Sequence, residues 1–311
     1  MRTRRSSRRG DEMAAFVNEN IRSVQFQLTT ICNERCIFCR KYTWPKKQIP
    51  IEVVAEKLEQ YPNAALQFSG GEPTMYDHLV ELMELIEGRP YKVYTNGVID
   101  DSGCGIEAKK KFLDGAKEIA ISFDADNMET YNSIRHPLDS YAFLKVLKTA
   151  SLYSEKVKLS MVVTKNNVQT IPNIIAFADS KHIKTRFYPL HTNTAGLVVE
   201  EKQLESLKEC LKGMDYDHSL TNVDQIFTPD YFVEKREFIP CGARNVSRLI
   251  DEDGREYPCC YAINDNGMDI DGKFAIEHPE RTLDSSDMYE YCDHCTRYRR
   301  FNATGETSEF I

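Results

Sequence analysis

Two kinds of apolar pattern alternate along the first two thirds of the chain. Short runs rich in β-branched and aromatic residues predict strands, and longer segments with an apolar face at helical spacing predict helices. Ser140 and Asn167 stand where a side chain could cap the helix that follows. The predicted strands cover residues 24–29, 65–69, 91–95, 118–124, 157–164 and 185–189, and the predicted helices cover residues 50–61, 76–87, 106–113, 140–152, 168–179 and 200–212.

Six such units predict an α/β fold with a parallel sheet and helices outside it. Right-handed crossovers would curl this sheet into a barrel or part of one. A complete barrel of eight units takes about 250 residues, whereas the alternation here stops near residue 213. The sequence therefore predicts a partial (β/α)6 TIM-like barrel over residues 22–213. It is preceded by a basic tail and lead-in (1–21) and followed by a linker (214–240) and a small, polar, metal-stapled domain (241–311).

The net charge of −8 argues against a protein that binds nucleic acid through a broad basic face. The charge is uneven, because five arginines in residues 1–12 stand against Asp11 and Glu12. These residues form a disordered tail, lie upstream of a true start at Met13, or make an arm that touches phosphates. No apolar run approaches the roughly 20 residues of a membrane span, and no signal peptide is evident. We therefore expect a soluble, cytoplasmic protein without a membrane partner.

The cysteines are concentrated in two groups. Eight of the ten lie within residues 32–39 and 241–295, whereas Cys104 and Cys210 stand alone. In a cytosolic chain, clustered cysteines indicate metal or redox chemistry rather than disulfides. The two isolated cysteines are expected to be buried and inert.

The first group, Cys32, Cys36 and Cys39, directly follows the first predicted strand. Loops after barrel strands hold the active sites of such folds. Three thiolates on one short loop can bind three irons of a [4Fe–4S] cluster and leave the fourth iron open, as catalysis requires. A zinc ion with a distant fourth ligand is the alternative.

The spacing of these cysteines, with the aromatic Phe38 before the third, resembles the signature of the radical S-adenosylmethionine (SAM) superfamily. The sequence Gly70-Gly71-Glu72-Pro73 after the second strand resembles that family's second motif. The resemblance covers about residues 22–190. It implies a [4Fe–4S] cluster whose open iron is chelated by SAM, and reductive cleavage of SAM to a 5′-deoxyadenosyl radical that abstracts hydrogen from a substrate. An external electron donor such as flavodoxin or ferredoxin is implied as a partner.

The resemblance also implies roles for single residues. Backbone at Gly70, Gly71 and Glu72, in the motif that Pro73 completes, would bind the SAM amino group, since glycine lets backbone approach a ligand closely. Backbone at Phe38 would lie near the adenine. A branched side chain at Gly71 would then block SAM without unfolding the barrel.

Polar residues at later strand ends are further candidates. By the same resemblance, Ser122 and Asp124 would face SAM or substrate, with ordinary capping of the strand end as the alternative. Arg135 would hold the SAM carboxylate through its forked guanidinium, or it is a surface arginine. Asp124, Tyr188 and His191 are the catalytic candidates, although Tyr188 and His191 could equally pack in the core. Asn96 is expected to be a turn residue.

The second cysteine group resembles the SPASM and Twitch extensions of radical SAM enzymes. Cys241 is followed by twelve residues, Gly254, four residues and Cys259, and Cys292 and Cys295 come later. The resemblance implies a second, auxiliary [4Fe–4S] cluster bound by these four cysteines, with Cys260 as a possible replacement for Cys259. Zinc bound by four thiolates is the alternative.

The leading functional hypothesis is oxidation or C–H functionalisation of a small polar molecule, an oxidoreductase reaction assisted by the auxiliary cluster. The second hypothesis is modification of a peptide, or of a nucleic acid reached by the basic arm. Peptide-modifying relatives often carry a leader-binding domain before the first cluster, and only 31 residues precede Cys32. The remote alternative is a non-catalytic metal-binding scaffold.

Overall fold

The computed structural model describes residues 17–39, 45–190, 196–228, 245–258 and 276. Several predicted residues lie outside this part of the chain: the arginines of the N-terminal tail, His191, Cys241, Cys259, Cys260, Cys292 and Cys295.

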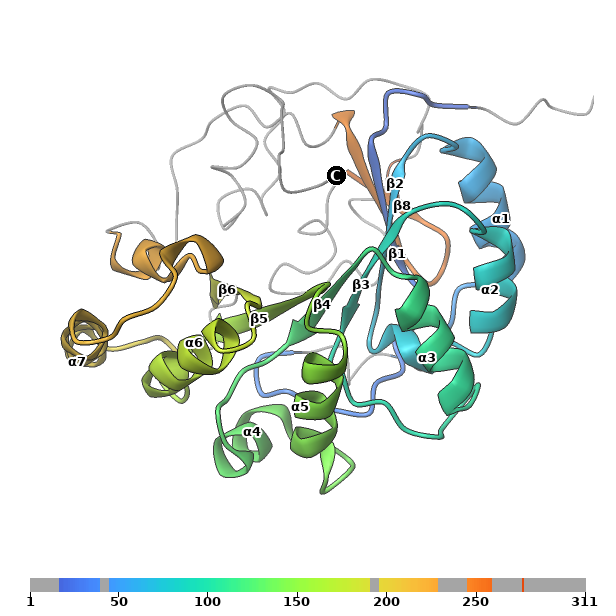
Figure 1. Ribbon diagram of the computed structural model, residues 1–311. Coiled ribbons are helices and arrows are strands. Elements are labelled where there is room, and N and C mark those ends of the chain that lie inside the picture. The colour runs from blue at the N-terminus through green and yellow to red at the C-terminus, as the bar shows by residue number, and fades with distance from the viewer. Residues whose placement is uncertain (1–16, 40–44, 191–195, 229–244, 259–275, 277–311) are drawn as a thin grey trace, which may run out of the picture.

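The fold is built on one curved sheet, which confirms the predicted α/β architecture (Figure 1). In the described residues its strand order is β6-β5-β4-β3-β2-β1-β7-β8, and the first six strands pair in parallel. The strands are β1 (Ser23–Gln27), β2 (Ala65–Ser69), β3 (Tyr91–Thr95), β4 (Glu118–Ser122), β5 (Val157–Val163), β6 (Lys184–Pro189), β7 (Ser247–Ile250) and β8 (Glu256–Tyr257).

Helices cover one side of this sheet. The described helices are α1 (Ile51–Gln60), α2 (Leu79–Leu85), α3 (Ile106–Gly115), α4 (Met128–Arg135), α5 (Ala142–Leu152), α6 (Ile171–Asp179) and α7 (Glu201–Lys212). Figure 1 shows α1, α2, α3, α5 and α6 along the outside of the curve. No helix of the described residues covers the opposite side of the sheet, which we call the helix-free face.

Side chains alternate between the two faces along each strand, so one face of the sheet carries apolar residues and the other carries mostly polar ones. In β5, Val157, Leu159, Met161 and Val163 are buried in the core, while the residues between them are half-buried. The half-buried positions are mostly polar: Lys92 and Tyr94 in β3, Lys158 and Ser160 in β5, and Arg186 and Tyr188 in β6. Polar side chains on this face are unusual for a parallel sheet, which is commonly apolar on both faces.

Local side-chain chemistry explains where the predicted elements were wrong. Helix α4 was not predicted, although Asn127 caps it by accepting a hydrogen bond from the Thr130 amide. Helix α2 begins at Leu79, later than predicted, and a separate 3₁₀ turn at Pro73–Met75 precedes it. Ser140 does not cap α5, whose first residue is Ala142.

Asn167 likewise does not cap a helix. Its Oδ1 accepts from the Thr164 amide, and its Nδ2 donates to the carbonyls of Asp124 and Val162. The residue therefore ties the ends of β4 and β5 together at the carboxyl edge of the sheet.

The sheet continues beyond the six predicted units. Strand β7 pairs in parallel with β1, and β8 returns antiparallel to β7 through a turn at Gly254, whose φ is +77°. Buried Glu256 on β8 contacts Lys57 at 2.8 Å and accepts a hydrogen bond from Tyr61, so the hairpin is fixed to α1. Residues 247–257 thus extend the barrel sheet, while the proposed division into a barrel, a linker and a metal-stapled domain stays a prediction. No helix in the described part of the chain is long and apolar enough to span a bilayer.

Candidate active site

The three N-terminal cysteines lie on one loop at the carboxyl edge of the sheet. This cluster loop, residues 32–39, follows β1; Cys36 is buried, and Cys32 and Cys39 are half-buried. The Cys39 amide donates to the Cys36 carbonyl at 3.0 Å. Burial raises the pKa of Cys32 to about 12 and that of Cys36 well above its ordinary value. These thiols stay protonated at neutral pH unless a metal replaces their protons.

The backbone of the cluster loop is held by helix α4. The amides of Arg35 and Ile37 donate to the carbonyls of Arg135 and Ile134, at 3.0 and 2.9 Å. Carbonyls in the last turn of a helix have no partner within the helix. Here the cluster loop uses two of them, so the helix that sequence reasoning missed is the support of the predicted metal site.

Two glycines bring the loop after β2 against residues 29–31, which lead into the cluster loop. The Gly71 amide donates to the Thr29 carbonyl, and the Glu72 amide donates to the Ile31 carbonyl at 2.8 Å. A Cβ at Gly71 would lie 2.3 Å from the Ile31 oxygen, and one at Gly70 would lie 2.4 Å from the Thr29 oxygen. The glycines are therefore required by the neighbouring backbone, and a side chain at Gly71 would displace the backbone at Ile31, directly before the cluster loop. The expected effect of such a side chain on SAM binding stays a prediction.

The Glu72 side chain is held inside the protein by hydrogen bonds to neighbouring residues. It is fully buried, and its carboxylate accepts hydrogen bonds from the Thr74 amide and hydroxyl, the Thr95 hydroxyl and the Asn96 amide. Burial raises its pKa, and these hydrogen bonds oppose that shift. The carboxylate joins the carboxyl ends of β2 and β3, so its oxygens are occupied by contacts within the chain.

Asn96 is more than the turn residue that was expected. Its Oδ1 accepts from the Val98 amide, as in a turn, but its Nδ2 donates to Asn33 Oδ1 at 2.6 Å. Asn33 in turn donates to the Val98 carbonyl at 3.3 Å. These buried amides connect the cluster loop to the end of β3.

A buried group of charges joins the cluster loop to helix α4 and to the end of β4. Arg135 donates to Glu34 Oε2 through Nε and Nη2, at 2.9 and 2.6 Å, and to Asp124 Oδ2 through Nη1 at 2.6 Å. Tyr131 also donates to Glu34, and the Val162 amide donates to Asp124. We call Glu34, Arg135 and Asp124 the carboxyl-end charge cluster. Burial raises the pKa of Asp124, and Arg135 opposes that shift.

This arrangement settles one of the alternatives for Arg135. The residue is 5% exposed, so it is no surface arginine. Two carboxylates already share its guanidinium, and its contact with a SAM carboxylate stays a prediction. Glu34 and Tyr131 were missed by sequence reasoning, although an acidic residue between two clustered cysteines is a signal that could have been used.

The remaining predicted residues lie around the same edge or on the helix-free face. Ser122, Phe38 and Tyr188 are half-buried, and buried Pro73 begins a 3₁₀ turn. Tyr188 pairs in register with Val162 on β5. Cys104 is half-buried, whereas Cys210 is exposed on α7, so the expectation of a buried thiol is wrong for Cys210.

The donor set of the cluster loop suits an iron–sulfur cluster. Among the described residues, no three His, Cys, Asp or Glu side chains converge on a single metal ion. A [4Fe–4S] cluster needs no such convergence, because each thiolate binds a different iron. Three cysteines on one loop at a mostly buried position fit such a group.

Comparisons with known proteins agree with this geometry. A sequence profile of the radical SAM superfamily matches residues 26–178. A probable GTP 3′,8-cyclase of Methanocaldococcus jannaschii is 23% identical over 298 residues, 90% of this chain and 81% of that protein. The mycofactocin maturase MftC of Mycolicibacterium smegmatis is 26% identical over 260 residues, 77% of this chain and 64% of the maturase.

A solved structure shares the fold. The structure of Streptococcus suis SuiB bound to S-adenosylmethionine superimposes with a TM-score of 0.57 at 17% identity, over 86% of this chain and 65% of SuiB. Residues 26–178 of the chain form a radical SAM domain. A domain of this superfamily implies SAM and a [4Fe–4S] cluster as cofactors.

Proposed function

We propose that the chain is a radical SAM oxidoreductase or related C–H functionalising enzyme, and that its substrate is a small polar molecule bound on the helix-free face. The observation that supports this is the polar lining of that face, from Lys92 and Lys158 near the amino ends of the strands to Ser122 and Tyr188 near the carboxyl ends. A small polar molecule can form hydrogen bonds and charge contacts with such side chains, which an apolar molecule of the same size cannot.

Each part of the site has a role in this proposal. Cys32, Cys36 and Cys39 would hold the cluster, and the carbonyls at Gly70–Glu72 would accept hydrogen bonds from the SAM amino group. When bound, the cluster and SAM supply the radical that removes hydrogen from the substrate. The chain's own contribution is to fix the cluster loop through α4 and the carboxyl-end charge cluster, and to keep water from it by burial.

Peptide modification is the second candidate. Relatives include the mycofactocin maturase, and SuiB has been solved bound to its precursor peptide SuiA. Nucleic-acid modification depends on the arginines at residues 1–12, which lie outside the described part of the chain. Removing residues 1–12 should abolish turnover of a nucleic-acid substrate and leave turnover of a small molecule unchanged.

An auxiliary cluster at Cys241, Cys259, Cys292 and Cys295 is also part of the proposal. The support is the hairpin of β7 and β8, which lies between the first two of these cysteines in the sequence and turns at Gly254. The Twitch resemblance implies a hairpin between these two cysteines, and the observed turn at Gly254 supports it. The auxiliary cluster would either accept an electron from the substrate or hold the substrate in place. The electron for SAM cleavage would come from an external flavodoxin or ferredoxin.

The test is a triple variant, Cys32→Ala/Cys36→Ala/Cys39→Ala, reconstituted anaerobically and reduced. The parent should contain about eight irons and the variant about four, and only the parent should form 5′-deoxyadenosine from SAM. Cys210→Ala, at an exposed thiol, is the matched control and should behave as the parent. Sustained SAM cleavage by the triple variant would overturn the proposal, and zinc in place of the remaining iron would overturn the auxiliary cluster.

A further inference from the structure

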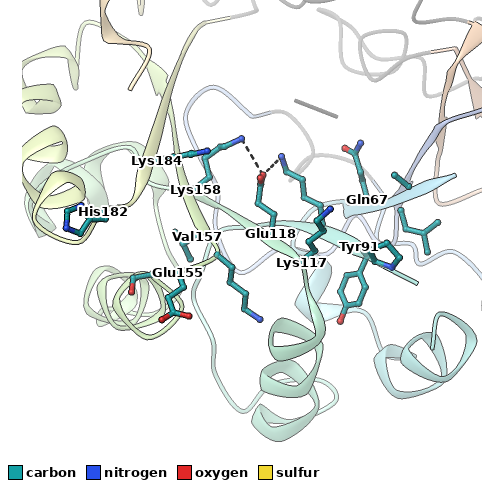
Figure 2. A pocket seen from close by; sticks show the side chains of 15 residues that line it. Gln67, Tyr91, Lys117, Glu118, Glu155, Val157, Lys158, His182 and Lys184 are labelled. Atoms are coloured by element: carbon teal, nitrogen blue, oxygen red, sulfur yellow. Dashed lines mark ion pairs between the residues drawn. The ribbon is translucent and has the colours of Figure 1, made fainter. Parts of the chain in front are cut away.

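A second group of charges lies at the amino ends of the strands. Lys92 on β3 pairs with Glu118 on β4, and Lys158 on β5 approaches the same Glu118 oxygen at 3.5 Å. Figure 2 marks the two ion pairs of Glu118 with dashed lines. Lys92 and Glu118 are direct partners in the sheet register. We call Lys92, Glu118 and Lys158 the amino-end charge cluster.

A cavity of about 280 Å³ borders this cluster. Its lining includes all three residues together with Lys117, Lys156, Lys184, His182 and Glu155. Five lysines against two glutamates give the lining a formal charge of +3 with histidine neutral. A concave surface lined by one sign of charge concentrates ions of the opposite sign.

The two central lysines are held in place. The Lys92 and Lys158 side chains are 21% and 12% exposed. The Lys92 ammonium also lies 4.9 Å from the centre of the Tyr94 ring, whose hydroxyl donates to Gln67 at 3.0 Å. Burial alone would lower the pKa of Lys92, but Tyr94, Glu118 and Tyr188 raise it, so the ammonium is charged at neutral pH. Ordered cations have already lost the rotamer freedom that ligand binding would otherwise cost.

The cluster lies on the face where the substrate is proposed to bind. Glu118 and Ser122 are the two ends of β4, and four residues of strand span roughly 13 Å. Ala120, between them and in register with both Tyr94 and Lys158, has only a methyl group. A small molecule could therefore reach from the lysines towards the carboxyl edge.

We propose that Lys92 and Lys158 bind a phosphoryl group of the substrate, while its reacting carbon lies towards the cluster loop. This assignment rests on the proposed function and names its substrate class. Glu118 already supplies one carboxylate to both lysines, so a substrate carboxylate of equal charge would gain little by competing. A phosphoryl group carries about −1.5 to −2 charges at neutral pH and three acceptor oxygens, and lysine serves as a point charge for phosphate.

Binding of inorganic pyrophosphate to the reconstituted full-length protein, measured by isothermal titration calorimetry, tests this directly. The parent should bind it, and Lys92→Met/Lys158→Met should bind at least about tenfold more weakly. Glu118→Gln should bind several-fold more tightly, because the competing charge is removed. Lys212→Met is the control, since Lys212 pairs with Glu209 on exposed α7.

The tighter binding by Glu118→Gln separates a ligand site from a structural ion pair, which would predict no gain, and it does not require the double lysine variant to fold. Unchanged affinity in both variants, or citrate binding as tightly as pyrophosphate, would overturn the phosphoryl assignment. The parent's SAM cleavage without substrate is measured in parallel. Failure of SAM cleavage with intact pyrophosphate binding would overturn the proposed function alone.

Discussion

The two ends of the sheet carry charge clusters of opposite composition. At the carboxyl end, one cation, Arg135, lies between two carboxylates; at the amino end, one carboxylate, Glu118, lies between two lysines. The carboxyl-end cluster is closed, because its side chains are at most 7% exposed. The amino-end cluster is more open, with Glu118 36% exposed beside a cavity.

This difference in burial indicates that one charge cluster stabilises the fold and that the other is available for binding. A buried ion pair becomes strongly destabilising when one partner is removed, because an uncompensated charge is left in the interior. An accessible pair contributes little to stability, and its charges remain open to a ligand. We therefore infer that the carboxyl-end cluster holds the metal-binding loop in place and that the amino-end cluster serves binding.

Removing the central cation is expected to have the largest effect on stability. Arg135→Met leaves the buried carboxylates of Glu34 and Asp124 without their cation and should lower the free energy of unfolding by about 3–5 kcal/mol. Lys158→Met, at the other end, leaves Lys92 on Glu118 and should cost about 1 kcal/mol or less. Urea unfolding of both proteins without metal measures the difference.

Arg135→Lys is the conservative variant for this comparison. It keeps the charge but loses the forked geometry that reaches both carboxylates, so it should fall between the parent and Arg135→Met. Equal losses in Arg135→Met and Lys158→Met would show that the two clusters have the same structural role, and the inferred division between them would fail.

A smaller loss of stability is expected at Gly71, where backbone contacts rather than charges hold the segment that leads into the cluster loop. Gly71→Ala places a methyl group 2.3 Å from the Ile31 oxygen, so the loop must shift. Overpacking of this kind costs about 1–3 kcal/mol, and the variant should retain less iron after reconstitution. Gly213→Ala is the control, because its methyl group would lie 3.9 Å from the nearest atom. Full iron content and parent stability in Gly71→Ala would show that the loop accommodates the side chain.

Strands whose signal lies within their own residues and the turn that follows could be predicted from the sequence. The bounds of β2 and β3 are as predicted, because each is a short apolar run ended by Gly70 or by the Asn96-Gly97 turn. Helix α4 was missed because it has eight residues and is mostly polar, although Tyr131, Ile134 and Arg135 form its buried side.

The contacts that hold the candidate site in place could not be predicted from the sequence. Glu34 and Arg135 are 101 residues apart, and no periodic pattern connects them. Likewise, β7 joins β1 across more than 200 residues, and a four-residue strand carries no sign of its partner. The motifs identified the metal-binding loop, whereas the charges beneath it depend on tertiary contacts.

The smallest expected effect on stability concerns a buried acid whose cationic neighbour lies at the limit of ion-pair distance. Asp251, after β7, accepts hydrogen bonds from the amides of Asp253 and Arg255 and from the Tyr257 hydroxyl, while the Arg255 guanidinium is 3.9 Å away. Burial raises the pKa of Asp251 to about 6. Because this value exceeds that of the unfolded chain, about 3.9, the native state binds more protons between these values, and stability falls as pH rises through that window.

Asp251→Asn should remove this dependence and gain about 1–2 kcal/mol over the parent at pH 7. Melting temperatures from pH 4 to 7 measure it, with Asp253→Asn, in the more exposed pair with Lys47, as the control. Parallel curves for the parent and Asp251→Asn would mean that the amide hydrogen bonds compensate the charge, and that a buried carboxylate at this edge does not require an arginine like Arg135.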